Sequence, residues 1–294
     1  MKKFSSILAV TDFSGPAHHA VERAARISKE TGAMLTLLHV LEPPPMETLK
    51  LLWSDKLPLS TAEAVEAARQ KLDELAASLL ERHQISVRPQ VVLGNFLSEL
   101  TRQADAAAAD LIVCGDSGES AVQHLLVGTT VERIIGHARC PVLIVKRPAR
   151  QSYGSVLVAV DLSPTSSRSI DEAMALAPNA EYVLLHAFDA PFAEKLKNAE
   201  VGEKLLTHYR VGARNDALAH MHAMSDAAGL PSGTTRFSVL QGDPFRRILE
   251  YDQTHVLDLI VLARSGHRLL EALFVGSVTR HVVDRSHCDV FVST

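Results

Sequence analysis

Short apolar runs alternate along the chain with longer stretches in which apolar residues recur every three or four positions. The first apolar run is ILAV at residues 7–10. The stretch that follows keeps one apolar helical face, made of Ala17, Val21, Ala24 and Ile27. Strands that alternate with helices predict a parallel sheet with right-handed crossover connections, in the α/β class.

The same alternation continues through the first half of the chain. Runs such as LIVC at 111–114 are apolar at every position, which predicts strands that are buried on both faces of the sheet. The predicted strands are 7–10, 34–40, 86–94, 110–115 and 141–146, and the predicted helices are 14–32, 60–83, 97–108 and 131–137. Pro89 predicts an irregular start for the third strand.

The second half of the chain repeats the first. ADLIVCGDSG at 109–118 returns as LDLIVLARSG at 257–266, and VGTT at 127–130 returns as VGSV at 275–278. Both pairs are offset by 148 residues. A constant offset over a whole half predicts two similar domains, 1–148 and 153–294, joined by a short polar segment.

Composition narrows the classes of function. The chain has 294 residues, of which 47% are hydrophobic and 22% charged, as in ordinary globular proteins. A net charge of −4 without a basic cluster argues against nucleic acid as a partner. No apolar run reaches the ~18 residues of a membrane span. The first apolar run is too short for a signal peptide and Asp12 interrupts it, so we expect a cytoplasmic protein without a membrane partner.

The cysteines and histidines do not predict a metal site. Three cysteines in apolar contexts favour free thiols over disulfides. His137 with Cys140, and His287 with Cys288, are differently spaced in the two halves and offer only two ligands each. We therefore predict no metal site made of protein ligands.

Unusual residues gather where two strands of each half end. Asp12 follows the first strand, and Asp161 is its counterpart in the second half. The fourth strand ends in GDSGESAVQHLLVGTT, residues 115–130. Ligands of open α/β sheets bind beyond the carboxyl ends of the strands, so these residues would cooperate if the first and fourth strands are neighbours.

The glycine segment predicts a cradle for phosphate. Gly115 and Gly118 would expose backbone N–H groups beyond the strand, and a new helix would begin near Gly128, Thr129 and Thr130. A helix start offers unpaired N–H groups and a positive dipole end, which suit an anion. Two other interpretations remain open: the glycines could form a plain tight turn, and the aspartates could cap the first helix of each half.

These residues resemble the universal stress protein family, whose nucleotide-binding members carry G-x2-G-x9-G-[ST]. Gly115, Gly118, Gly128 and Thr129 fit every position of that pattern. The resemblance covers the whole chain as a tandem of two domains. It implies a five-stranded parallel sheet in the order 3-2-1-4-5 in each domain, and ATP or a related adenine nucleotide as the ligand of one subgroup.

The resemblance also implies which residues form each site. In the first half they are Val10, Asp12, Val40, Gly115, Gly118, Gly128, Thr129 and Thr130. In the second half they are Ala159, Asp161, Ala187, Gly266, Gly276, Ser277 and Val278, and the nearby Arg264 and His267 add phosphate-binding side chains. The second half has Ala263 in place of Gly115, which weakens its site if that position needs a positive φ or close clearance.

The first half keeps every glycine but places Asp116 and Glu119 beside the expected phosphates, where a divalent cation such as Mg²⁺ or Mn²⁺ would offset them. We favour the first half as the nucleotide site; binding in the second half, in both or in neither stays open. No catalytic set can be assembled from the strand ends, so we predict no catalytic residues. The family resemblance implies at most slow ATP hydrolysis.

Two functions remain in view. One is a nucleotide-binding module of the stress response, and the other is a tandem scaffold whose pockets are empty or hold another small molecule. The family usually pairs domains through their fifth strands, which implies pairing within this chain around Val142–Val145 and Val290–Val292. A further homodimer stays open.

Overall fold

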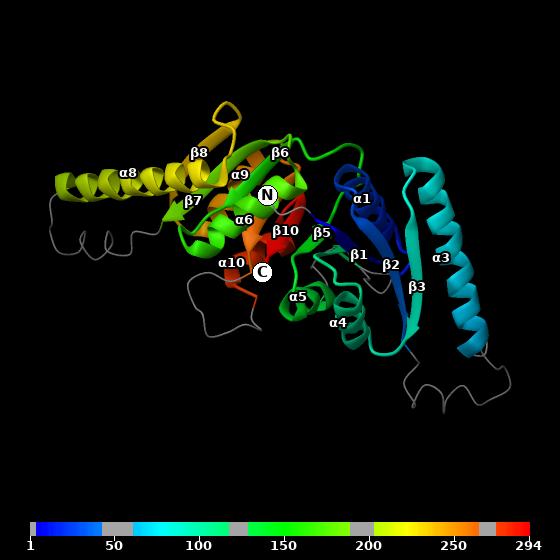
Figure 1. Ribbon diagram of the computed structural model, residues 1–294. Helices are drawn as coiled ribbons and strands as arrows, with labels where there is room; N and C mark the ends of the chain where they lie inside the picture. Colours follow the sequence, from blue (N-terminus) through cyan, green and yellow to red (C-terminus); the bar gives the residue numbers. More distant parts are fainter. Residues whose placement is uncertain (1–3, 43–60, 118–128, 189–202, 265–274) are drawn as a thin grey trace. The chain divides into compact units, whose positions relative to one another are not determined.

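A computed structural model describes residues 4–42, 61–117, 129–188, 203–264 and 275–294 of the chain (Figure 1). These residues form two compact units, an N-terminal unit (Lys3–Ser152) and a C-terminal unit (Tyr153–Thr294). Each unit is an α/β fold with a parallel sheet, so the predicted fold class is confirmed.

The N-terminal unit has five parallel strands in the order β3-β2-β1-β4-β5 among its described residues. The strands are β1 (Ser6–Val10), β2 (Met34–Leu41), β3 (Val87–Leu93), β4 (Leu111–Gly115) and β5 (Val142–Val145). The helices are α1 (Gly15–Thr31), α3 (Thr61–His83), α4 (Phe96–Ala106) and α5 (Thr129–His137). The expected order and the adjacency of the first and fourth strands are confirmed.

The C-terminal unit repeats this arrangement with the order β8-β7-β6-β9-β10. Its strands are β6 (Ser155–Ala159), β7 (Glu181–Phe188), β8 (Thr235–Gln241), β9 (Leu259–Ala263) and β10 (Asp289–Ser293). Its helices are α6 (Pro164–Leu176), α8 (Glu203–Ala228), α9 (Pro244–Thr254) and α10 (Ser277–Arg285).

The helices cover both faces of each sheet. In the N-terminal unit α1 packs against α3 and α4 packs against α5, and the pairs α6 with α8 and α9 with α10 repeat this in the C-terminal unit (Figure 1). The central strands are consequently buried on both sides: Leu8, Val113, Val158 and Val261 have no exposed surface. Apolar runs without alternation therefore mark these central strands.

Local sequence signals set the ends of α1. The Ser14 side chain accepts a hydrogen bond from the Ala17 amide at 3.4 Å, and Pro16 lies in the first turn, where its missing N–H costs nothing. Gly32 ends the helix with a φ of 76°, a left-handed conformation that glycine adopts without strain. The start of α1 packs directly against β4.

The third strand differs from its prediction. Strand β3 runs through Pro89, which pairs with Leu37 of β2, rather than starting irregularly before it. Strand β3 lies at the edge of the sheet of this unit. An edge strand forms backbone hydrogen bonds with a neighbour on one side only. It therefore tolerates proline, which has no N–H group.

A partly buried carboxylate joins α1 to α3. Glu22 Oε2 lies 3.0 Å from His83 Nε2, and its other oxygen pairs with the Arg82 guanidinium. Burial alone would raise the pKa of Glu22, but the hydrogen bonds and charges of His83 and Arg82 hold it below the ordinary value of 4.5. These contacts favour the charged carboxylate and connect α3 to α1.

Glu22→Gln is expected to lower the free energy of unfolding by about 1–2 kcal/mol at pH 7, allowing for solvent screening. Since the folded-state pKa is lowered, this contribution is complete above pH 4.5 and is lost as the pH falls through the lowered value. Urea unfolding of wild type and Glu22→Gln at pH 7 and pH 3 measures this contribution. Glu81→Gln, at an exposed position, is the control. A difference between wild type and Glu22→Gln that is equal at both pH values would contradict this account.

Several features are absent from the described part of the chain. None of its helices is long and apolar enough to cross a membrane. It contains no group of three or more histidine, cysteine or acidic side chains placed to hold a metal ion. The three cysteines are free, and Cys114 and Cys288 are buried.

Candidate functional site

Asp12 and Asp161 each hold the turn that follows the first strand of their unit. The Ser14 amide donates to Asp12 Oδ1 at 3.0 Å, and the Ser163 amide donates to Asp161 Oδ1 at the same distance. The residue between each pair is left-handed: Phe13 has a φ of 66° and Leu162 a φ of 63°. Both units thus keep a conformation that side chains disfavour in order to hold the aspartate at the strand end.

Two histidines brace the same strand ends. His39 Nδ1 lies 2.8 Å from the carbonyl oxygen of Thr11, and His186 Nδ1 lies 2.8 Å from that of Val160. Each histidine stands on the second strand of its unit and bonds the backbone just beyond the first. The same contact occurs in both units, and it holds the backbone next to Asp12 and Asp161 at the end of the first strand.

The space at Gly115 is occupied by the protein itself. A Cβ atom on Gly115 would lie 2.8 Å from the carbonyl carbon of Pro16 and 2.9 Å from its oxygen. The φ of Gly115 is not in the left-handed range. The start of α1 therefore explains the glycine. Ala263 was expected to weaken the second site if this position needed a positive φ. Gly115 does not have one, so that reason does not apply.

The thiol beside Gly115 is unreactive. Burial raises the pKa of Cys114 to about 12, and the negative charge of Asp116 adds to the rise. The thiol is a nucleophile only when ionised. Cys114 is therefore a buried strand residue and contributes no chemistry at this edge.

The C-terminal unit has a cavity of about 230 Å³ at the carboxyl edge of its sheet. Six of the residues predicted for the second site line it: Ala159, Asp161, Ala187, Gly276, Ser277 and Val278. They come from the ends of β6 and β7 and from the start of α10. The structure thus brings residues that lie up to 119 positions apart (159 and 278) around one cavity.

Ala263, the counterpart of Gly115, also lines the cavity, whereas three further lining residues were not predicted. Ser166 comes from the first turn of α6, and its hydroxyl donates to Asp161 Oδ1 at 2.6 Å. Pro244 and Ile248 come from α9 on the other side. Ser166 had a signal in the sequence, since a hydroxyl five residues after the aspartate can reach back to it. Pro244 and Ile248 had none, because their approach depends on how α9 packs.

The start of α10 gives the cavity a polar end. The Gly276 amide donates to the Arg264 carbonyl at 2.9 Å, and the Thr279 hydroxyl donates to the Ala263 carbonyl at 2.8 Å. Gly276 caps α10 and provides no side-chain hydrogen bond to the first turn. The positive end of the helix therefore faces a cavity whose other walls are largely apolar.

The N-terminal unit places part of its predicted site. Val10, Asp12, Val40 and Gly115 lie at the carboxyl ends of the neighbouring strands β1, β2 and β4. Thr130 lies in the first turn of α5 and is exposed. Gly118 and Gly128 of this unit, and Gly266 and His267 of the other, lie outside the described residues, as does the side chain of Thr129.

Sequence comparison connects the chain to known proteins. The family model described as the universal stress protein family matches residues 3–146 and again residues 152–293. A universal stress protein of Mycobacterium tuberculosis is 25% identical over 322 aligned positions, which cover 98% of this chain and 94% of that protein. One of Methanocaldococcus jannaschii is 28% identical over 148 positions, covering 50% of this chain and 85% of its own.

Solved structures agree at the level of the fold. A universal stress protein of Archaeoglobus fulgidus matches with a TM-score of 0.70 at 20% identity, covering 99% of this chain and 97% of that one. A putative universal stress protein of Pseudomonas aeruginosa matches with a TM-score of 0.67 at 18% identity, covering 99% and 93%. Because the family model matches both halves of the chain in turn, this protein belongs to the universal stress protein family and carries the family's domain twice in tandem.

Proposed function

We propose that the protein binds an adenine nucleotide, with ATP as the first candidate, and that occupancy of the site regulates its role in a stress response. The cavity of the C-terminal unit carries this proposal, because residues chosen from the sequence as ligand contacts line one space of about 230 Å³. In the described lining, the aliphatic walls suit a base, the Asp161 carboxylate suits a sugar and the helix start suits an anion.

The lining suggests how the nucleotide would lie. Ala159 and Ala187 line the cavity with short side chains, beside which a flat base would fit, and the Asp161 carboxylate in the same lining would accept hydrogen bonds from ribose hydroxyls. The cavity is smaller than the ~300–1,000 Å³ of typical ligand sites. It would therefore hold the base and sugar, with the phosphates directed to Ser277 and Val278 at the start of α10.

The N-terminal unit remains the other proposed site. It has the complete glycine pattern, and Asp12 stands at the strand end as Asp161 does. Its glycines after Gly115 lie outside the described residues. Mg²⁺ or Mn²⁺ would accompany the nucleotide here, because Asp116 and Glu119 are close to the expected phosphates in sequence.

A tandem scaffold without nucleotide is the second candidate function. It is favoured by the internal roles found for the predicted residues. Asp12 and Asp161 accept backbone hydrogen bonds, and the clearance at Gly115 serves α1. Pairing of the two fifth strands within the chain, and a further homodimer, stay proposals that either function accommodates.

Titration of the purified protein with ATP tests the nucleotide proposal. We expect saturable binding heat with and without MgCl2, and stabilisation by about 2.7 kcal/mol when free ATP reaches 100 times its Kd. Thermal unfolding with and without ATP measures the stabilisation, and guanosine triphosphate is the control for base selectivity. If millimolar ATP produces no binding heat and no shift of the unfolding midpoint, the result favours the scaffold.

A further inference from the structure

Two serine side chains and one backbone amide converge on a single oxygen of Asp161. The Ser163 amide donates to Asp161 Oδ1 at 3.0 Å and the Ser166 hydroxyl donates to it at 2.6 Å. The Ser163 hydroxyl donates to the same oxygen. Because an ionised carboxylate only accepts hydrogen bonds, each serine commits its one hydroxyl proton to Asp161.

Ser166 holds Asp161 by its backbone as well. The Asp161 amide donates to Ser166 Oγ at 3.0 Å, so one hydroxyl contacts both the main chain and the carboxylate of the same residue. Ser166 stands in the first turn of α6 and is only 1% exposed. These two contacts fix the direction of the carboxylate relative to the end of β6.

The first unit uses the matching positions differently. Ser14, the counterpart of Ser163, accepts a hydrogen bond from the Ala17 amide at 3.4 Å and so caps α1. Ser163 makes no such bond to α6 and donates to Asp161 instead. The counterpart of Ser166 is Ala17, whose side chain has no donor. The second unit therefore gives up a helix cap and gains two hydroxyl contacts to its aspartate.

The arrangement presents hydrogen-bond acceptors to the cavity. Asp161 and Ser166 both line it. Since the Ser166 proton is committed to Asp161, its hydroxyl can meet a ligand only as an acceptor. Two neighbouring acceptors suit a ligand with two adjacent O–H donors, and the 2′ and 3′ hydroxyls of ribose are such a pair.

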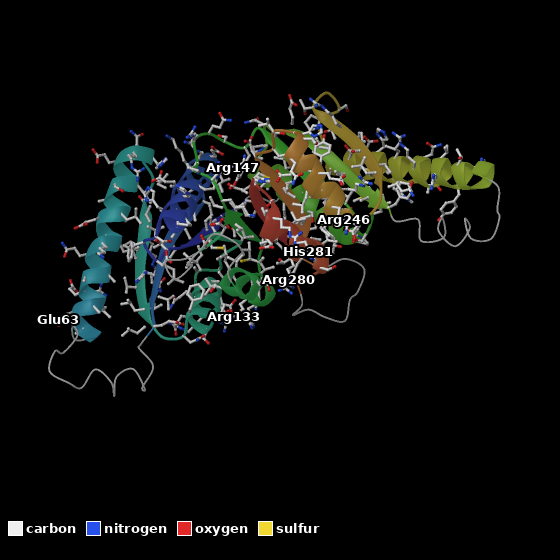
Figure 2. The ribbon with its side chains drawn as sticks, turned by 180° about the vertical axis from the view of Figure 1, so that it is seen from behind. Glu63, Arg133, Arg147, Arg246, Arg280 and His281 are labelled. Carbon is white, nitrogen blue, oxygen red and sulfur yellow. The ribbon has the colours of Figure 1, made fainter. Side chains whose placement is uncertain are left out.

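The side of the cavity formed by α9 and α10 is held by contacts that do not involve Ser166. The Phe245 ring of α9 stacks on the His281 ring of α10 with centroids 4.5 Å apart, and the Arg246 guanidinium lies 5.8 Å from the Phe245 centroid. Figure 2 shows Arg246 and His281 on these neighbouring helices. Removing the Ser166 hydroxyl would therefore leave this side in place and act at Asp161.

We propose that Ser166 is a positioning residue: by holding Asp161, it makes the cavity of the C-terminal unit select ligands that carry both ribose hydroxyls over their deoxy counterparts. The inference rests on the proposed nucleotide site and specifies it further. A ligand without these hydroxyls leaves a fixed carboxylate unpaired in the cavity, which costs more than the missing bonds alone. The first unit, with Ala17, holds its aspartate without this contact.

Paired calorimetric titrations with ATP and 2′,3′-dideoxy-ATP test the proposal. The full chain carries Val40→Phe, so that the strand ends of the first unit are blocked. We expect ATP to bind at least about tenfold more tightly than the dideoxy nucleotide. Equal affinities would overturn the inference and leave the nucleotide site standing. ATP binding that Val40→Phe abolishes would place the nucleotide in the first unit and also overturn the inference. No binding of ATP by wild type would overturn the proposed function as well.

Variants in the same background assign the preference to Ser166. Ser166→Ala is expected to weaken ATP binding by about tenfold and dideoxy-ATP binding far less, so that the preference largely disappears. Ser166→Thr keeps the hydroxyl and is expected to keep the preference. Thermal unfolding without ligand confirms that each variant is folded.

Ser169→Ala is the matched control. It also removes one buried hydroxyl from α6, but that hydroxyl donates to the Thr165 carbonyl at 3.3 Å and does not belong to the described lining of the cavity. We expect Ser169→Ala to leave the preference for ATP unchanged. If Ser166→Ala weakens both nucleotides equally, or weakens neither, Ser166 does not position Asp161 for the sugar and the inference is wrong.

Discussion

Gly115→Ala is expected to lower the free energy of unfolding by about 1–3 kcal/mol, as overpacking of a tight interior does. The added Cβ would lie 2.8 Å from the Pro16 carbonyl carbon and 3.1 Å from the Ala17 amide nitrogen. Both are backbone atoms of the first turn of α1, which Ser14 and Asp12 hold in place. Relief would therefore require α1 to move away from β4. Urea unfolding of the full chain measures the loss.

Ala263→Gly in the second unit is the matched control. It changes one methyl group at the same position of the repeat, where the fold already accommodates alanine, and we expect a cost of about 0.5–1 kcal/mol from the flexibility of glycine. If the Gly115→Ala protein is as stable as wild type, α1 can move away from β4 at little cost in free energy. The glycine would then need another explanation, such as the close approach of a ligand.

Ala187→Phe is expected to weaken nucleotide binding by close to a hundredfold while the protein stays folded. The aromatic ring would occupy the cavity of about 230 Å³ into which Ala187 faces. Excluding about 100 Å² of base surface at ~25 cal/mol per Å² costs about 2.5 kcal/mol, which sets the expected loss. Calorimetric titration with ATP measures it, and thermal unfolding without ligand confirms that the fold persists.

Val40→Phe is the corresponding change in the first unit. If the second unit holds the nucleotide, Val40→Phe leaves the affinity unchanged and Ala187→Phe lowers it by close to a hundredfold. If the first unit holds the nucleotide, Val40→Phe lowers the affinity and Ala187→Phe leaves it unchanged. Loss of one of two binding events in each variant would place a nucleotide in both units. Full binding in the double variant would exclude both strand ends as sites.

The fold was accessible from the sequence because its signals are local and occur twice. Runs such as LIVC specify burial on both faces, Ser14 and Gly32 mark the ends of α1, and the 148-residue offset shows the duplication. The strand order came from the family resemblance. The prediction that Pro89 makes the start of its strand irregular was wrong, because the sequence does not reveal that this strand lies at an edge.

The site was accessible only in part. Side chains at strand ends, such as Asp161 and Ala187, could be chosen because strand position fixes the edge on which they lie. Pro244 and Ile248 reach the cavity through the packing of α9, which no local pattern specifies. The role of Gly115 was also hidden, since a glycine that clears a neighbouring helix and one that admits a ligand look identical in sequence.

Mass spectrometry of small molecules released by denaturing the freshly purified protein tests the central claim most directly. The account predicts an adenine nucleotide in wild type at a substantial fraction of the protein concentration, and its depletion in the folded variant with both Ala187→Phe and Val40→Phe. An adenine nucleotide carried equally by wild type and by that double variant, or no nucleotide in wild type together with no binding of added ATP, would contradict it.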